Sequence, residues 1–260
     1  MAAGEMWSGL RTGAYAGYRL YKQSRLHEQR STRWSGIWDF AEPLVIAAVF
    51  IILRAGSVVD VGETEMSYGL FVVVGMLQWQ TFVDALTRPL GLIRSSRNLL
   101  LHTKVSPESL LLMVVYEVGY KAALRVITTI GIVFLWGEGD LLGALLFAAT
   151  FSLNLIVGLG LGLMLSPLST IYGDVERVVG IIIRPMMFMS GVVFPLTGDL
   201  QFLVFYNPVA FLIDNLRTIL ATGIPSYPGG LLIMLAASLL ILLLSWAIFH
   251  RTVRVLVERV

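Results

Sequence analysis

The sequence lacks several residue types on which metalloproteins and ATPases depend. It has no cysteine, which excludes disulfides and thiolate metal sites. Its three histidines, His27, His102 and His250, lie too far apart to offer the ligand spacing of a metal site. It has no G-x-x-x-x-G-K-[ST] stretch, so no phosphate cradle for ATP is visible. We therefore expect the chain to bind no metal or cofactor and to hydrolyse no ATP itself.

Charge is also scarce. Charged residues make up 14% of the 260 residues, against about 25% in soluble domains, whereas 57% are hydrophobic, against about 45–50%. A helix that spans a membrane needs about 20 mostly apolar residues. The sequence therefore predicts an all-α integral membrane protein with six spans. The predicted spans are residues 40–59, 67–87, 108–136, 141–165, 177–196 and 229–249.

The distribution of Lys and Arg predicts the orientation of the spans. Basic residues gather before the first span, between the second and third, and after the sixth, whereas the loops after the first and third spans are acidic. Cytoplasmic loops carry the excess of Lys and Arg in membrane proteins. Both termini are therefore predicted to be cytoplasmic. No apolar run occurs before about residue 40, so we expect no cleaved signal peptide.

Two segments outside the spans have patterns of their own. Residues 1–38 place Trp7, Tyr18 and Tyr21 at helical spacing with basic residues between them, which predicts an amphipathic helix in the membrane interface. A soluble arm helix is the alternative. Residues 197–228 hold apolar runs too short to span, which predicts short or re-entrant helices on the outer side. The whole chain is predicted to be one transmembrane domain, with the bundle in 39–260.

Charged residues inside the predicted spans require partners. Glu117, Lys121 and Arg125 are four residues apart and share one helix face, where they should contact protein or water rather than lipid. One interpretation is a Glu117–Lys121 pair, with Arg125 bound to a neighbouring helix. The other is that Lys121 or Arg125 borders a hydrated path for an anionic substrate. Asp84 and Arg88 have the spacing of a structural ion pair within one helix.

Glycine and proline indicate where helices approach closely or break. Gly158 and Gly162 form a small-xxx-small step, which favours close packing between membrane helices. In the fifth predicted span, Pro185 follows Arg184 and removes a backbone hydrogen bond, and Gly191 adds a further weak point. A helix broken in this way fits either a moving gate or a static kink.

Five short stretches carry a family resemblance. They are, in order, RSTRWSGIWDFAEPL, NLLLHTKVSPESLL, IYGDVERVV, RPMMFMSGVVFPL and FYNPVAFLIDNLRTIL. In order and spacing they resemble the ABC-2 type permease subunits that export polysaccharides, and most of all the capsular-polysaccharide permeases of Gram-negative bacteria. The resemblance covers nearly the whole chain. Each stretch is weak alone, but the ordered set is fairly specific.

The resemblance implies a half-transporter of the bacterial inner membrane rather than an enzyme. Two copies would surround a channel, and each would bind a separate P-loop ATPase subunit that holds ATP and Mg. The cargo would be a lipid-linked capsular polysaccharide, passed to a periplasmic adaptor and an outer-membrane export protein. Nucleic acid is not an expected partner.

The resemblance also implies which residues would act. The stretch 94–107 would include the helix that couples the chain to the ATPase, the segment around Asp174 would be a second contact, and spans one and five would line the channel. The candidate ATPase contacts are Arg94, Arg97, Asn98, His102, Lys104 and Asp174. The candidate channel and gate residues are Trp79, Phe82, Lys121, Arg125, Arg184, Pro185, Phe188, Phe194, Asn207 and Pro208. The aromatic members could stack on sugars or simply pack in the protein.

Three other functions remain open at this point. An exporter of the same architecture could move O-antigen, teichoic acid, a lipid or a drug. A membrane-embedded enzyme acting on lipid-linked sugars would need acids, histidines or arginines clustered at one membrane face, whereas the acids here are scattered. A structural membrane anchor would not need the kinked fifth span or the intramembrane charges.

Overall fold

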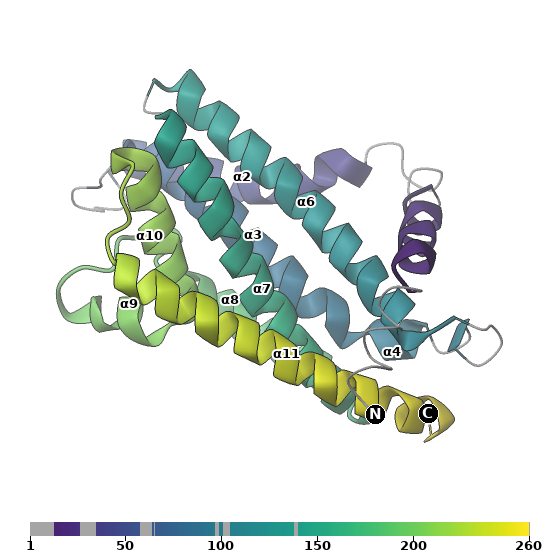
Figure 1. The fold of residues 1–260 in the computed structure, drawn as a ribbon. Coiled ribbons are helices and arrows are strands. Elements are labelled where there is room, and N and C mark those ends of the chain that lie inside the picture. Colours follow the sequence, from purple (N-terminus) through teal and green to yellow (C-terminus); the bar gives the residue numbers. More distant parts are fainter. Residues whose placement is uncertain are drawn as a thin grey trace.

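The computed structural model describes residues 13–26, 35–57, 64, 66–96, 99–100, 105–137 and 140–259. Within these ranges every regular element is helical, which confirms the predicted all-α class (Figure 1). The first four labelled helices are α2 Ser35–Ala55, α3 Tyr68–Leu90, α4 Leu92–Ser95 and α6 Pro107–Leu135. The remaining elements are α7 Leu141–Ile171, α8 Asp174–Met189, η1 Gly198–Leu200, α9 Phe202–Tyr206, α10 Pro208–Thr222 and α11 Pro228–Arg259.

Four helices in the described part of the chain are long and apolar enough to cross a membrane. They are α3, α6, α7 and the Pro228–Val253 part of α11. Even α3, with 23 residues, rises about 34 Å and so exceeds the roughly 30 Å of a bilayer core. Four of the six predicted spans are thereby confirmed as apolar helices of sufficient length. The count of six stays a prediction, because it depends on α2 and α8.

Helix α8 differs from the fifth predicted span in its bounds. The prediction covered 177–196, but the helix begins at Asp174 and ends at Met189, after 16 residues. It ends early because Gly191 adopts a left-handed φ of 68°, which turns the chain out of the helix. Pro185 lies inside the helix and does not end it. At about 1.5 Å per residue, α8 rises only about 24 Å.

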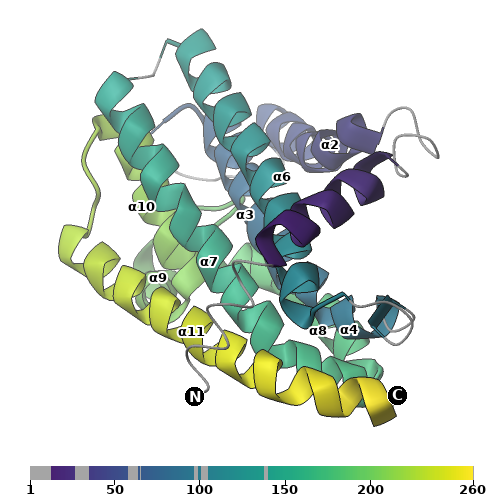
Figure 2. The ribbon, with the colours of Figure 1, turned by 45° about the vertical axis from the view of Figure 1, so that its right-hand side comes forward.

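Helix α7 lies at the centre of the bundle, between α3 and α11 (Figures 1 and 2). A Cβ on Gly158 would lie 2.6 Å from the Cβ of Ala85 in α3, and one on Gly160 would lie 2.9 Å from Ile241 in α11. Gly162 likewise meets the backbone of Leu86 in α3. The predicted close packing at Gly158 and Gly162 is confirmed. Alternating glycines let α7 touch a helix on each side.

The segment predicted as short or re-entrant helices contains η1, α9 and α10. Of these, α10 is deeply buried because it packs against α7 and α3. Asn207 caps its start, with a side chain that accepts a hydrogen bond from the Val209 backbone N–H, and Gly223, with φ 74°, caps its end. The short helices are confirmed, whereas their position relative to a membrane stays a prediction.

Residues 13–26 are helical, as predicted, and pack across α6 (Figure 2). Gly17 makes this contact close, because a Cβ there would lie 2.9 Å from the Cβ of Leu112. The Tyr18 and Tyr116 rings meet edge to face at 5.7 Å, and the Arg25 guanidinium lies 4.0 Å from the centre of the Tyr120 ring. Trp7 lies outside the described residues, and the interfacial placement of this helix stays a prediction.

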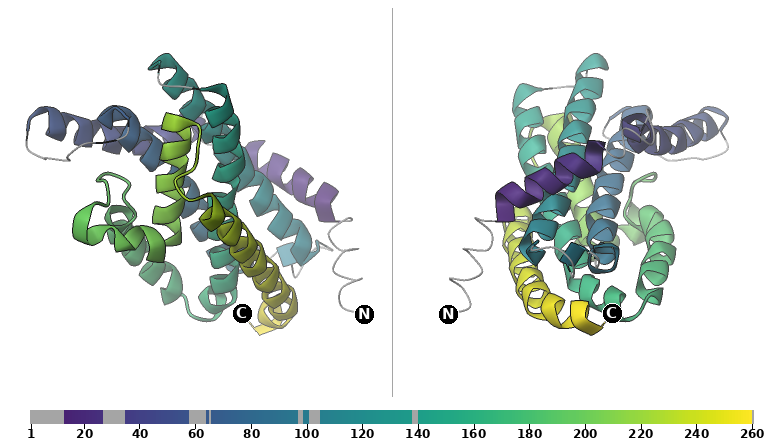
Figure 3. Two further views of the ribbon diagram at one scale, coloured as in Figure 1. Left: turned by 60° about the vertical axis from the view of Figure 1, so that its left-hand side comes forward. Right: turned by 90° about the vertical axis from the view of Figure 1, so that its right-hand side faces the viewer.

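Helices α2 and α8 both lie on one side of the molecule (Figure 3). Helix α2 packs on α3 and leaves Val45, Val49 and Ile52 exposed. Of the α8 residues, all of which the structure describes, only Ile183 is buried. A single copy of the chain therefore presents an uncovered, largely apolar face on this side.

Candidate functional site

Arg94 joins three elements at one end of the bundle. Its Nη2 donates to the Ser169 carbonyl near the end of α7 at 2.7 Å, and its Nη1 lies 3.8 Å from Oε1 of Glu176 in α8. The Ser169 hydroxyl donates to the same Glu176 oxygen at 3.0 Å. Asp174, at the start of α8, is exposed and pairs with Arg177 at 3.6 Å. The fold thus brings the two predicted ATPase-contact regions, around Arg94 and Asp174, to one place.

The other predicted ATPase contacts are not placed. Arg97, Asn98, His102 and Lys104 lie outside the described residues. The same end of the bundle also holds the start of α6 and the end part of α11, because His250 Nδ1 lies 2.7 Å from Oε1 of Glu108. The docking role of this end stays a prediction.

The intramembrane charges pair across α3 and α6. Arg125 is buried, and its guanidinium donates to Asp84 at 2.6 Å and to the Thr81 hydroxyl at 3.3 Å. Arg88 donates to Glu117 at 2.7 Å. Binding of Arg125 to a neighbouring helix is therefore confirmed.

The predicted Asp84–Arg88 pair within α3 is wrong, because Arg88 binds Glu117 and Asp84 binds Arg125. The reason is geometric. Both sets of charges lie on facing sides of two packed helices that run in opposite directions. The acid and the base on α3 therefore each bind an opposite charge on α6 rather than one another. The Glu117–Lys121 pair stays a prediction. Lys121 lines a cleft beside these pairs, together with Thr87.

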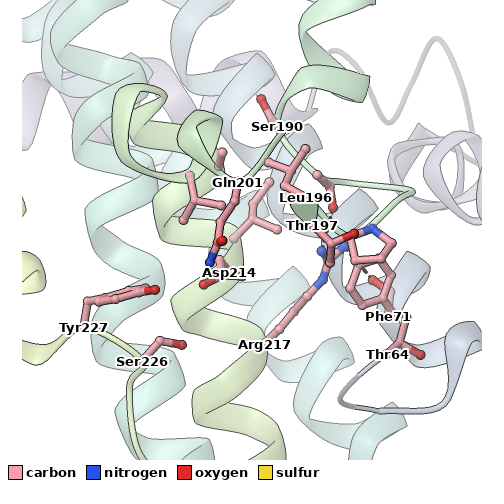
Figure 4. Close-up of a pocket in the computed structure, with 15 residues that line it drawn as sticks. Thr64, Phe71, Ser190, Leu196, Thr197, Gln201, Asp214, Arg217, Ser226 and Tyr227 are labelled. Carbon is pink, nitrogen blue, oxygen red and sulfur yellow. Dashed lines mark hydrogen bonds between the residues drawn. The ribbon is translucent and has the colours of Figure 1, made fainter. Parts of the chain in front are cut away.

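A polar cavity of about 280 Å³ lies at the opposite end of the bundle (Figure 4). It is bounded by the start of α3, the chain after α8, α10 and the residues before α11. The polar residues that line it are Thr64, Ser190, Thr197, Gln201, Asp214, Arg217, Ser226 and Tyr227. Hydroxyl, amide and carboxylate groups of this kind can hydrogen-bond water or sugar hydroxyls.

Arg217 organises the wall of this cavity. Its guanidinium donates to the carbonyls of Gly191 (2.6 Å), Val192 (2.6 Å) and Phe71 (2.8 Å), and it stacks 3.4 Å from the centre of the Phe71 ring. Gly75 leaves room for it, since a Cβ there would lie 2.6 Å from the Val192 oxygen and would overlap the guanidinium. Arg217 thus satisfies two carbonyls of the chain that follows α8, those of Gly191 and Val192, and ties them to α3. We did not single out this residue as a site from the sequence, although it is a charge within an apolar helical run.

Asn207 and Pro208 lie at the same break. The Asn207 amide donates to the Ser190 hydroxyl at 2.9 Å and to the Met189 carbonyl at 3.3 Å, while its oxygen caps α10. Pro208 is the exposed first residue of α10. Both residues therefore fix the path of the chain between α8 and α10, and their part in gating stays a prediction.

The aromatic candidates fall into two environments. Phe188 and Phe194 stack at 6.5 Å, and both contact Phe50 of α2, at 6.2 and 5.9 Å between ring centres. This cluster joins α2 to the end of α8, beside exposed Arg184 and Pro185. In contrast, Trp79 and Phe82 pack on each other inside the core. Burial favours a packing role for that pair, and sugar stacking stays a prediction for all four.

No family model matches the chain. The chain is 21% identical over 223 residues to the polysialic acid transport protein KpsM of Escherichia coli, an alignment that covers 82% of this chain and 84% of that protein. It is 22% identical over 228 residues to the O-antigen export system permease protein RfbA of Klebsiella pneumoniae, covering 85% of this chain and 86% of the relative. The chain resembles polysaccharide export permeases. This confirms the family resemblance found in the sequence.

Both relatives are named as transport or export proteins. Across the described ranges no three His, Asp or Glu side chains gather to hold a metal ion. Two ion pairs, Arg88–Glu117 and Arg125–Asp84, join α3 to α6, and the wall of the polar cavity contains carbonyls that Arg217 binds.

Proposed function

We propose that this chain is the membrane permease subunit of an ATP-driven exporter that moves a lipid-linked polysaccharide across the bacterial inner membrane. The observation that carries the proposal is the similarity, over more than four fifths of both chains, to permeases named for polysialic acid transport and O-antigen export. The four long apolar helices support placement in a membrane. A capsular polysaccharide is the proposed cargo.

The assembly would contain two copies of this chain. The uncovered face of α2 and α8 is where a second copy would meet the first, with α2 and α8 acting as the first and fifth of six spans. In that arrangement Arg184 and Phe188, both exposed on α8, would face either the partner or the polymer. The cavity around Arg217 would lie at the periplasmic side, where hydroxyl and amide groups could contact sugar as it leaves.

The energy would come from a separate ATPase, also present in two copies, which would hold ATP and Mg. Its docking surface would be the end of the bundle where Arg94 joins α4, α7 and α8. Both termini would be cytoplasmic at this end. A periplasmic adaptor and an outer-membrane export protein would receive the polymer.

Deletion of the gene in its own bacterium tests this proposal. Surface glycan and intracellular glycan would be fractionated and quantified, with the wild-type gene on a plasmid as the control. Loss of one surface polymer with accumulation of the same polymer inside the cell is expected. Unchanged surface glycans would reject polysaccharide export.

O-antigen is the second candidate cargo, because the chain is 22% identical over 228 residues to an O-antigen permease and 21% identical over 223 residues to a polysialic acid transport protein, which does not separate the two cargos. Chemical analysis of the accumulated polymer separates the two. A polymer destined for lipopolysaccharide would leave the mutant with lipid A core that carries no O-chain, whereas a capsular polymer would leave the lipopolysaccharide complete.

A further inference from the structure

Four buried polar side chains lie on helices α3, α6 and α7, which pack on one another. Gln78 in α3 and Asn154 in α7 are 0% exposed, and Arg125 and Thr129 in α6 are each 1% exposed. Five of their side-chain atoms, here called the orphan atoms, have no hydrogen-bond partner among the residues that the structure describes: Nε2 and Oε1 of Gln78, Nε of Arg125, Oγ1 of Thr129 and Oδ1 of Asn154. Buried polar atoms are almost always hydrogen-bonded in native proteins, so a further molecule is expected beside them.

Hydrogen bonds and helix geometry bring the four side chains to one place. The Asn154 amide donates to the backbone carbonyl of Gln78 at 2.8 Å, which joins α7 to α3. Arg125 donates to the Thr81 hydroxyl at 3.3 Å, which joins α6 to α3, and Gln78 lies one turn before Thr81. Thr129 lies one turn after Arg125 on a helix that runs in the opposite direction, so it extends to the same side of this contact as Gln78 does. The orphan atoms therefore surround a single contact of three helices.

The orphan atoms include both donors and acceptors. Gln78 Nε2 and Arg125 Nε can only donate, whereas Gln78 Oε1 and Asn154 Oδ1 can only accept, and the Thr129 hydroxyl can do either. A metal cation would leave the N–H groups without an acceptor. A small anion would leave the carbonyl oxygens without a donor. Water both donates and accepts, and one buried water makes about two to four hydrogen bonds.

Water can reach this contact through Asp84. One carboxylate oxygen of Asp84 binds Arg125 at 2.6 Å. The Asp84 side chain is 22% exposed and also lines a polar cleft of about 210 Å³ between α3 and α6, whose lining includes Thr87 and Arg88. Water in the cleft is therefore separated from the buried Arg125 guanidinium by one side chain.

We propose that the contact between α3, α6 and α7 binds about two water molecules, which bridge Gln78 and Asn154 to Arg125. The waters accept hydrogen bonds from Gln78 Nε2 and Arg125 Nε, and they donate to Gln78 Oε1 and Asn154 Oδ1. They give the buried guanidinium a polar contact in addition to the Asp84 carboxylate. The site depends on neither the cargo nor the ATPase, so its test is separate from that of the proposed function.

X-ray radiolysis of the purified full chain in detergent tests the proposal directly. Radiolysis converts a bound water into a hydroxyl radical, which oxidises the side chains beside it, and mass spectrometry measures the oxidation rate of each residue. Phe151 lies one turn before Asn154 on α7 and is 1% exposed, whereas the matched control Phe249, on α11, is 2% exposed. Phe151 is expected to be oxidised several-fold faster than Phe249. A rate for Phe151 no greater than that for Phe249 would overturn the proposal.

A substitution at Gln78 locates the water. Gln78→Leu has similar volume but cannot hydrogen-bond water, so it is expected to lower the oxidation rate of Phe151 to near that of Phe249. It is also expected to lower the midpoint of thermal unfolding by about 3 °C or more, because the orphan atoms of Arg125 and Asn154 lose their bridge. Gln23→Leu, at an exposed position on the helix 13–26, is the control and keeps both values.

A dry contact predicts the opposite result for Gln78→Leu, because there the substitution only removes two unsatisfied atoms. An unchanged or higher midpoint, or an unchanged oxidation rate of Phe151, would therefore overturn the site. If this variant does not fold, the comparison of Phe151 with Phe249 in the wild-type chain decides alone.

Discussion

The ion pair between Asp84 and Arg125 stabilises a charge inside an apolar bundle, and its strength can be measured. The Arg125 side chain is 1% exposed, and its guanidinium binds Asp84 at 2.6 Å. Removal of one partner of a buried pair leaves the other charge uncompensated and typically costs about 3–5 kcal/mol. Asp84→Ala is therefore expected to lower the free energy of unfolding by about that amount. The contact with Thr81, at 3.3 Å, is too weak to replace a carboxylate.

A double-mutant cycle in detergent separates the pair from its surroundings. Arg125→Met fills similar volume without charge, so the double variant Asp84→Ala/Arg125→Met is expected to recover much of the loss from Asp84→Ala alone. Arg177→Ala is the control: it removes the Arg177–Asp174 pair, whose side chains are 81% and 87% exposed, and the cost expected is about 1 kcal/mol or less. Equal losses for Asp84→Ala and Arg177→Ala would refute the reasoning from burial.

Three further predictions concern the two ends of the bundle. Gly75→Val would displace the Arg217 guanidinium, and it is expected to lower the apparent melting temperature in detergent by at least as much as Arg217→Met. A wild-type melting curve would contradict the close contact between Gly75 and Arg217. Arg94→Ala would release α4 from α7 and α8, and it is expected to reduce ATPase co-purification several-fold, with Arg19→Ala as the control. Unchanged recovery of the ATPase would show that Arg94 is not part of the docking region. Arg184→Ala is expected to reduce surface glycan while the protein remains in the membrane fraction, and wild-type export would argue against a channel role for this residue.

Features fixed by local sequence were predicted well. Long apolar runs predicted the four helices that are long and apolar enough to cross a membrane, because only helices satisfy the backbone over such lengths in lipid. The spacing of Gly158 and Gly162 was enough to predict a close helix contact, although not which helix it meets. Short apolar runs between 197 and 228 correctly indicated short helices.

Features set by the register between helices were not predictable from one sequence. Asp84 and Arg88 have the spacing of a pair within one helix. In the folded chain, however, each of them binds a different residue of α6. Likewise, the three carbonyls that Arg217 binds belong to segments up to 146 residues away in sequence. The end of α8 depends on Gly191, which the sequence marked as one of several possible breaks.

Helix α8 connects the end of the bundle around Arg94 to the turn at Gly191. Its first turn is held through Glu176 to Arg94 and Ser169, while its far end leads directly into the turn at Gly191. A rod of 16 helical residues, about 24 Å long, that tilts by about 10° about its first turn moves its other end by about 4 Å. A small displacement of α4 would therefore be transmitted along α8 to Phe188 and to the wall of the polar cavity.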